Sequence, residues 1–235
     1  MDDESSAKAA APRPRKRDAE RTRRSILAAG LKEFSQQGYS GARIDKIARQ
    51  ARCNIRMLYH YFGSKKNLYV AVLESAYDDI LNREAEVKVD LDKPMEGVLA
   101  LLRFVYEYFE KNPAFEGLLR TENMMQGKFV LRSSHVSESA FALRRVIAEL
   151  IASGERQGVF REGLDPVQVY VTILAVSRFH LANAFSLSAL LDVDLTRADW
   201  RKARFDHSIA LLTSYLAAPP AAEGAEAVRP TTAVA

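Results

Sequence analysis

The stretch IDKIARQARCNIRMLYHYF, residues 44–62, contains two short helical patterns separated by a brief break. In the first, apolar residues recur at the spacing of a single helix face: Ile44, Ile47, Ala48 and Ala51. The second begins after Asn54, a residue type that favours the N-cap position. Its predicted inward-facing residues are Ile55, Leu58, Tyr59 and Phe62. Two short helices joined by a tight turn predict a helix-turn-helix, whose second helix can lie in the major groove of DNA.

Helical patterns continue on both sides of this stretch. One covers about residues 18–37, with Gly38 placed to end it, and another begins after Ser64, a further N-cap residue. We therefore expect residues 20–66 to form a three-helix DNA-binding domain.

The charge distribution agrees with a DNA-binding role for the N-terminal part of the chain. Residues 1–66 carry 16 Lys and Arg against 7 Asp and Glu, a net charge of +9, whereas residues 67–235 carry 18 against 23, a net charge of −5. A basic block joined to a mildly acidic body suggests a module that faces nucleic acid. A solvated basic tail is the alternative that charge alone leaves open.

The polar residues on and around the second pattern are the candidate DNA contacts. Arg56 is suited to a guanine edge or a phosphate, and Met57 to a thymine methyl group. Phosphate contacts that orient the protein are expected from Arg43, Lys65 and Lys66. Further outward-facing candidates are Arg52, Asn54 and His60.

The remainder of the chain reads as longer, more apolar helices and predicts an all-α protein with about nine helices. The body helices are expected at about 95–110, 114–123, 128–153, 166–190 and 197–216. Asp165 followed by Pro166 is a strong helix start signal. Residues 67–217 therefore predict a larger helical domain. Residues 1–19 and 218–235 lack bulky apolar residues in quantity, and we expect two disordered tails there.

Several classes of protein are disfavoured by the sequence. A single cysteine cannot form an intramolecular disulfide, and no signal peptide or membrane span is indicated, so we expect a cytoplasmic protein. The four histidines are scattered, and neither a phosphate-binding Gly-rich loop nor a metal-ligand cluster is present in the sequence, so we expect no enzyme, cofactor or metal. A hydrolase triad assembles across a fold, and spacing alone leaves that alternative open.

Residues 26–74 resemble the N-terminal DNA-binding domain of the TetR family of transcriptional regulators. The resemblance covers the run ILAAGLKEFSQQGYSGARIDKIARQARCNIRMLYHYFGSKKNLYVAVLE. Its most specific elements are Phe34 with Gly38-Tyr39, the Ile47-Ala48 pair and LYHYFGSKKNLY, residues 58–69. The resemblance implies a homodimeric regulator in which residues 67–217 form a ligand-binding and dimerisation domain; this domain binds a small molecule and alters the spacing of two recognition helices. It also implies DNA backbone contacts for Tyr59, His60 and Lys65.

The chain departs from the family pattern inside the helix-turn-helix itself. Family members usually have Thr or Ser where this chain has Ala42-Arg43, Gly at Arg52, and Lys-Gly-Thr at residues 55–57. The operator sequence of relatives therefore cannot be transferred to this chain. Arg52 is expected in a left-handed turn conformation that residues other than glycine adopt at some cost.

The resemblance also suggests how the protein dimerises. In the family the last two long helices form a four-helix interface with their counterparts, which here would be residues 166–190 and 197–216. Both segments carry more apolar surface than one inward face needs, and a seam recurs along the second: Phe205, Ile209, Leu212 and Leu216. A purely intramolecular core is the alternative.

Polar and aromatic residues inside the apolar body helices are candidates for binding a small-molecule effector. We single out Arg120, Asn123, Phe179 and Asn183. Capping or interface hydrogen bonds are the alternative roles for the polar ones. The sequence thus predicts a ligand-responsive repressor that binds a palindromic double-stranded DNA operator as a homodimer; the alternative is a DNA-associated protein without small-molecule control.

Overall fold

The computed structural model describes residues 14–219, with the side chains of residues 14–17 and 137–143 excepted. Within these residues the fold is helical throughout, apart from one isolated β-bridge between Phe160 and Ala217. The elements are α1 (Pro14–Gly41), α2 (Ile44–Gln50), α3 (Ile55–Phe62), α4 (Lys65–Ala85), α5 (Pro94–Lys111), α6 (Pro113–Met124), η1 (Val130–Arg132), α7 (Ser134–Arg156), α8 (Pro166–Ala182), α9 (Ala184–Leu191) and α10 (Ala198–Leu216). The predicted all-α fold is confirmed.

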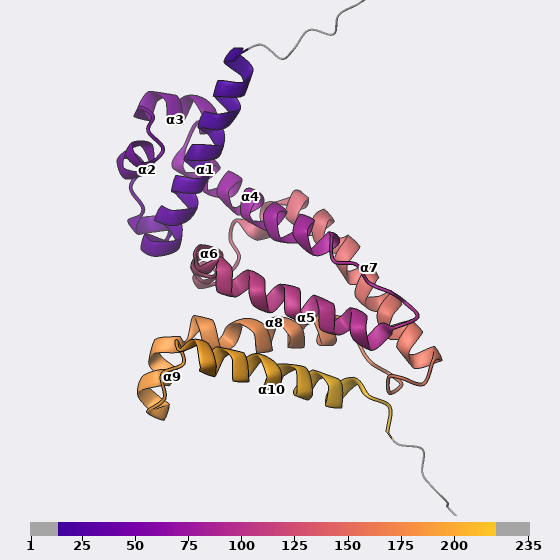
Figure 1. The fold of residues 1–235 in the computed structure, drawn as a ribbon. Helices are drawn as coiled ribbons and strands as arrows, with labels where there is room; N and C mark the ends of the chain where they lie inside the picture. Colours follow the sequence, from indigo (N-terminus) through magenta and orange to yellow (C-terminus); the bar gives the residue numbers. More distant parts are fainter. Residues whose placement is uncertain (1–13, 220–235) are drawn as a thin grey trace, which may run out of the picture.

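The helices form a small cluster and a larger layered body (Figure 1). α1, α2 and α3 lie together at one end, and α4 runs from this cluster into the body, where α7 accompanies it. α5, α8 and α10 lie in successive layers, and α6 packs against α1. The buried apolar residues form one continuous cluster that extends from Ile26 on α1 to Leu216 on α10. The predicted boundary at residues 66 and 67 therefore falls within α4, which contributes to both parts.

Local capping signals placed several helix starts correctly. Ser64 Oγ accepts a hydrogen bond from the backbone N–H of Asn67 at 3.1 Å, and Asp165 Oδ1 accepts one from that of Val167 at 2.7 Å. Gly38 has a φ of 68°, which marks a kink, but the helical assignment continues to Gly41. Residues 14–19 belong to α1 and not to a disordered tail, whereas residues 1–13 and 220–235 lie outside the described part.

Two predicted helices in the body are wrong in extent. The helix expected at 128–153 begins only at Ser134, because residues before it form η1 and a turn with Gly127 at a φ of 71°. The helix expected at 166–190 breaks at Asn183 into α8 and α9, which are bent by 73°. There the Asn183 side-chain amide donates to the carbonyl of Phe179 at 2.8 Å, a local bond that competes with helix continuation.

Among the helices of residues 14–219, none is long and apolar enough to cross a membrane alone; α8 and α9 together reach the length and composition of a span, but only as a bent pair.

Candidate DNA interface and effector cavity

The helix-turn-helix is built from two small buried faces and a constrained turn. Ile47 and Ala48 are buried on α2, and Leu58 and Phe62 on α3. The Asn54 side-chain oxygen accepts from the backbone N–H of Met57 at 2.7 Å, which confirms the predicted N-cap of α3. Arg52 has a φ of 53°, which confirms its predicted left-handed conformation.

The outer face of α3 carries more apolar surface than the sequence pattern predicted. Ile55 and Tyr59 were expected inside but are 43% and 44% exposed. The inward face of this two-turn helix accommodates only Leu58 and Phe62, which are separated by one helical turn, and the positions next to them turn outward. The exposed side chains from α3 now include Ile55, Arg56, Met57, Tyr59 and His60. Exposure of Tyr59 agrees with the DNA contact that the family resemblance implies.

The start of α2 is fixed to α1 by a carboxylate that the sequence reading missed. Glu33, 1% exposed, accepts from the backbone N–H of Arg43 at 3.3 Å and pairs with Lys46 at 2.8 Å. The Arg43 guanidinium itself makes two 3.2 Å bonds to Asp45 on the surface. Exposed ion pairs contribute little free energy, so a DNA phosphate can replace Asp45 as the partner of Arg43.

The side chain of Lys65 is engaged inside the protein. Its ammonium group donates to the carbonyls of Ser40 at 3.2 Å and Ala42 at 2.7 Å, and it lies 5.2 Å from the centre of the Tyr39 ring. Burial lowers the pKa of Lys65, and the negative charge of Glu33 opposes that change. Lys65 therefore braces the α1–α2 link against α4, and its ammonium group is held by contacts within the protein. Lys66, by contrast, is exposed.

The body contains a cavity of about 320 Å³ between α4, α5, α6, α7 and α8. Its lining residues are Tyr77, Ile80, Leu81, Glu84, Phe109, Phe115, Leu119, Asn123, Val136, Arg144, Tyr170, Leu174 and Arg178. Of the four predicted ligand contacts, Asn123 lines this cavity, and its amide donates to the carbonyl of Leu119 at 2.9 Å.

The other three predicted ligand contacts lie elsewhere. Arg120 is exposed and is not among the cavity-lining residues. Phe179 and Asn183 line a separate pocket of about 420 Å³ on the outer side of α8, and Phe179 is 58% exposed. A single helix presents several faces, and the sequence did not reveal which of them the body would cover.

Two carboxylates in and beside the cavity have different surroundings. Glu116 accepts two hydrogen bonds from the Arg178 guanidinium, at 2.9 and 3.0 Å. Glu84 is 3% exposed; its Oε2 accepts from the Tyr170 hydroxyl at 3.4 Å, and its Oε1 has no partner among the described residues. Burial raises the pKa of Glu84 to about 7, although the Tyr170 bond acts to lower it.

Helix α6 lies between the cavity and α1. On one face Phe115, Leu119 and Asn123 line the cavity, and on another Gly117 is so close to α1 that a Cβ atom there would be 2.8 Å from the Ser35 carbonyl oxygen. The Thr121 hydroxyl, on the same side as Gly117, donates to the Phe34 carbonyl at 3.4 Å. Displacement of α6 would therefore act directly on the backbone of α1.

A further buried carboxylate, that of Glu122, fixes α6 on the side that faces α4. Glu122, 3% exposed, accepts from the Tyr69 hydroxyl at 3.0 Å and from the backbone N–H groups of Phe129 and Val130 at 2.5 and 2.9 Å. These bonds join α6 to α4 and to the chain that follows α6. This role of Glu122 could not be predicted from the sequence, because Tyr69 lies 53 residues away along the chain.

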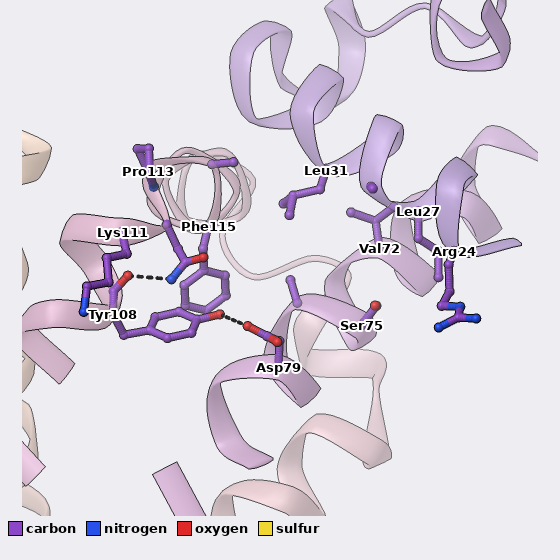
Figure 2. Close-up of a pocket in the computed structure, with 14 residues that line it drawn as sticks. Arg24, Leu27, Leu31, Val72, Ser75, Asp79, Tyr108, Lys111, Pro113 and Phe115 are labelled. Carbon is purple, nitrogen blue, oxygen red and sulfur yellow. Dashed lines mark hydrogen bonds between the residues drawn. The ribbon is translucent and has the colours of Figure 1, made fainter. Parts of the chain in front are cut away.

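Beside this contact, a cleft of about 380 Å³ separates part of α1 from the body (Figure 2). Leu27 and Leu31 lie on its α1 side, Val72 on its α4 side, and Phe115 on the far side. The Tyr108 hydroxyl donates to Asp79 at 2.8 Å across the base of the view. Phe115 lines both the cleft and the cavity, so one ring separates the two spaces.

A helix-turn-helix with an exposed second helix, joined to a helical body that holds a cavity, defines a class of DNA-binding regulators. Residues 26–72 match the family described as bacterial regulatory proteins, tetR family, and residues 94–212 match the tetracyclin repressor-like C-terminal domain. The chain belongs to the TetR family: it is a DNA-binding transcriptional regulator and not an enzyme.

Curated relatives cover most of the chain. It is 35% identical over 190 residues to the transcriptional repressor NicS of Pseudomonas putida, and this alignment covers 79% of this chain and 90% of that protein. It is 41% identical over 184 residues to the transcriptional regulator RutR of Escherichia coli, or 77% of this chain and 84% of that one. Among solved structures, the regulator SCO4942 of Streptomyces coelicolor has a TM-score of 0.64 at 23% identity over 84% of this chain and 99% of its own, which shows the fold.

Proposed function

We propose that this protein is a ligand-responsive repressor that binds a palindromic DNA operator as a homodimer in the cytoplasm. The observation that carries the proposal is the position of α6, which lines the cavity with Phe115 and contacts α1 through Gly117. The names of relatives such as NicS, a transcriptional repressor, support repression as the output.

The proposed DNA contacts come from the second helix, the turn and the start of α4. Arg56 and Met57 read base edges, while Tyr59 and His60 contact the backbone beside them. The remaining contacts are Arg43, Arg52, Asn54, Lys66 and the backbone N–H of Lys65.

The proposed dimer interface is the outer face of α8 together with α10. Val167, Val171 and Phe179 lie at multiples of four residues along α8 and are 52%, 52% and 58% exposed. On α10 the predicted seam is wrong for Leu212 and Leu216, which are fully buried within the chain. Leu211, 46% exposed, lies beside them and faces outward. Twofold pairing of this face would place two recognition helices for the two halves of a palindrome.

Effector binding is proposed to act through α6. A ligand in the cavity would press on Phe115, and the cleft beyond that ring leaves α1 room to respond. Because α1 packs on α2 and α4, its movement would change the separation of the two recognition helices in a dimer.

Mapping of genomic binding sites would supply an operator for a direct test. With that DNA, we expect Arg56→Ala to relax base preference at one position in each half-site by about 1–3 kcal/mol. Arg120→Ala removes the same charge from an exposed position on α6 and is the matched control. Competition binding against single-base operator variants measures the preference. An unchanged preference in Arg56→Ala would show that Arg56 does not read bases.

A further inference from the structure

The Glu84 carboxyl group is a deeply buried polar group of the cavity wall whose bonding is incomplete. Only 3% of the residue is exposed, Oε2 receives a long 3.4 Å bond from Tyr170, and Oε1 has no partner within the described residues. A buried acceptor without a donor destabilises a protein by about 1–3 kcal/mol. A cavity that contains such an oxygen is suited to a ligand that supplies the missing donor.

Two other polar residues along the cavity, Arg178 and Asn123, already have partners. Arg178 makes two bonds to Glu116 and lies 5.6 Å from the centre of the Phe109 ring. The Asn123 amide is bonded to its own helix. An anionic ligand would find the paired guanidinium of Arg178 already occupied and would face the Glu84 carboxylate. Arg144, the other cation among the lining residues, is exposed to solvent, so the buried side of the cavity at Glu84 favours a donor over an anion.

The walls of the cavity favour a flat ring. Phe115 meets Tyr77 edge to face, with ring centres 5.7 Å apart, and stacks on Phe109 at the same distance. Tyr170 adds a fourth aromatic side chain next to Glu84. Aromatic rings pair favourably in offset or edge-to-face arrangements. A volume of about 320 Å³ is small for a ligand site, which limits the ligand to a compact molecule.

We propose that the effector is a compact aromatic compound carrying an N–H donor, and that this N–H binds Oε1 of Glu84 while the ring packs among Tyr77, Phe109 and Phe115. The inference rests on the proposed effector role of the cavity and names the chemistry that the cavity selects.

A pair of probe compounds isolates the N–H group. Indole and benzofuran have nearly the same shape, but only indole carries an N–H donor. At about pH 8.5, where Glu84 is ionised even with its pKa raised to about 7, calorimetric titration of the full-length protein should show indole binding at least about tenfold more tightly than benzofuran, since a hydrogen bond to a charged acceptor contributes about 1.5–3 kcal/mol. Equal affinities, tighter binding of benzofuran, or no binding of either probe would overturn the proposal.

Variants of Glu84 test whether this carboxyl group makes the distinction. Glu84→Leu should bind the two probes with similar affinity, whereas Glu84→Gln retains a carbonyl acceptor and should keep part of the preference for indole. Glu86→Leu makes the same change at an exposed position two residues away and should behave as the wild type. Circular dichroism checks that each variant is folded. A full preference for indole in Glu84→Leu would overturn the assignment to Glu84.

Operator release is measured separately, so that the two proposals can fail independently. If indole binds through Glu84 but the operator complex is unaffected at saturation, the site chemistry holds and the control mechanism fails. If DNA is released by a compound whose binding is unaffected by Glu84→Leu, the control mechanism holds and the site chemistry fails.

Discussion

Two regions of the body each bury a glutamate, and they treat it in opposite ways. At the contact between α6 and α4, Glu122 receives three hydrogen bonds, from Tyr69, Phe129 and Val130. In the cavity, Glu84 is equally buried but receives one long bond and leaves an oxygen without a partner in the described part of the chain. A saturated carboxylate holds elements together, whereas an unsaturated one marks a place suited to another molecule.

Helix α4 takes part in both regions, through Tyr69 in the first and Glu84 in the second. Tyr69 and Glu84 are fifteen residues apart on this helix, a separation of about 22 Å along its axis. The saturated region therefore lies near the DNA-binding cluster and the unsaturated one deep in the body. The hydrogen bonds of Glu122 thus stabilise the packing of α6 on α4 near the DNA-binding cluster, whereas the Glu84 oxygen without a described partner lies where a ligand is proposed to bind.

The largest expected effect comes from breaking the saturated region. Glu122→Ala removes the acceptor of three donors and should lower the free energy of unfolding by at least about 3 kcal/mol. Urea unfolding followed by circular dichroism measures the loss. Glu122→Gln keeps one oxygen acceptor and should lose less. A loss below about 1 kcal/mol in Glu122→Ala would remove the contrast between the two carboxylates.

A smaller, pH-dependent effect is expected in the unsaturated region. Burial raises the pKa of Glu84 to about 7 from an ordinary value of 4.5. Between these values the unfolded chain has lost the proton that the folded protein retains, so stability falls as the pH rises from about 4.5 to 7. Glu84→Gln cannot ionise and should gain stability relative to wild type between pH 5 and pH 8, by up to about 3 kcal/mol.

The measurement is urea unfolding of both proteins at the two pH values. Glu86→Gln, at an exposed position, should show no such difference, and groups that titrate in both proteins cancel in the comparison. A difference between Glu84→Gln and wild type that is constant with pH, or that shrinks as the pH rises, would contradict a raised Glu84 pKa.

The smallest effects come from removing one hydroxyl in each region. Tyr69→Phe breaks a 3.0 Å bond to Glu122 and should destabilise by about 1.5 kcal/mol, while Tyr170→Phe breaks the 3.4 Å bond to Glu84 and should cost about 0.5 kcal/mol. Both changes leave the ring in place, so thermal and urea unfolding report on the hydroxyl alone. Equal losses would mean that the two carboxylates are equally dependent on their tyrosines.

Features with local causes were predictable from the sequence. The N-cap of α3 needs only Asn54 and the backbone three residues later, and the left-handed turn at Arg52 was expected from the family pattern, which has Gly at that position. The same holds for the Asp165-Pro166 start of α8. Each of these depends on a few neighbouring residues, which a single sequence displays.

Features that depend on packing between distant segments were not predictable. Glu84 and Glu122 read as ordinary charged helix residues, and their burial depends on partners 86 and 53 residues away. Ile55 and Tyr59 fit an apolar helix face, but the neighbouring helices cover only Leu58 and Phe62. The position of Arg120 outside the cavity likewise depends on which face of α6 meets the body.

Arg178 connects the effector cavity with the proposed dimer interface. Its side chain lines the cavity and also the outer pocket beside Phe179, on the face proposed to meet a second copy of the chain. In such a dimer, a ligand that shifts the Arg178–Glu116 pair in one subunit would alter the surface against which the other subunit packs. The two effector molecules would then bind cooperatively. By linkage, each would change the affinity of the other subunit for its effector through the dimer interface as well as through the shared DNA.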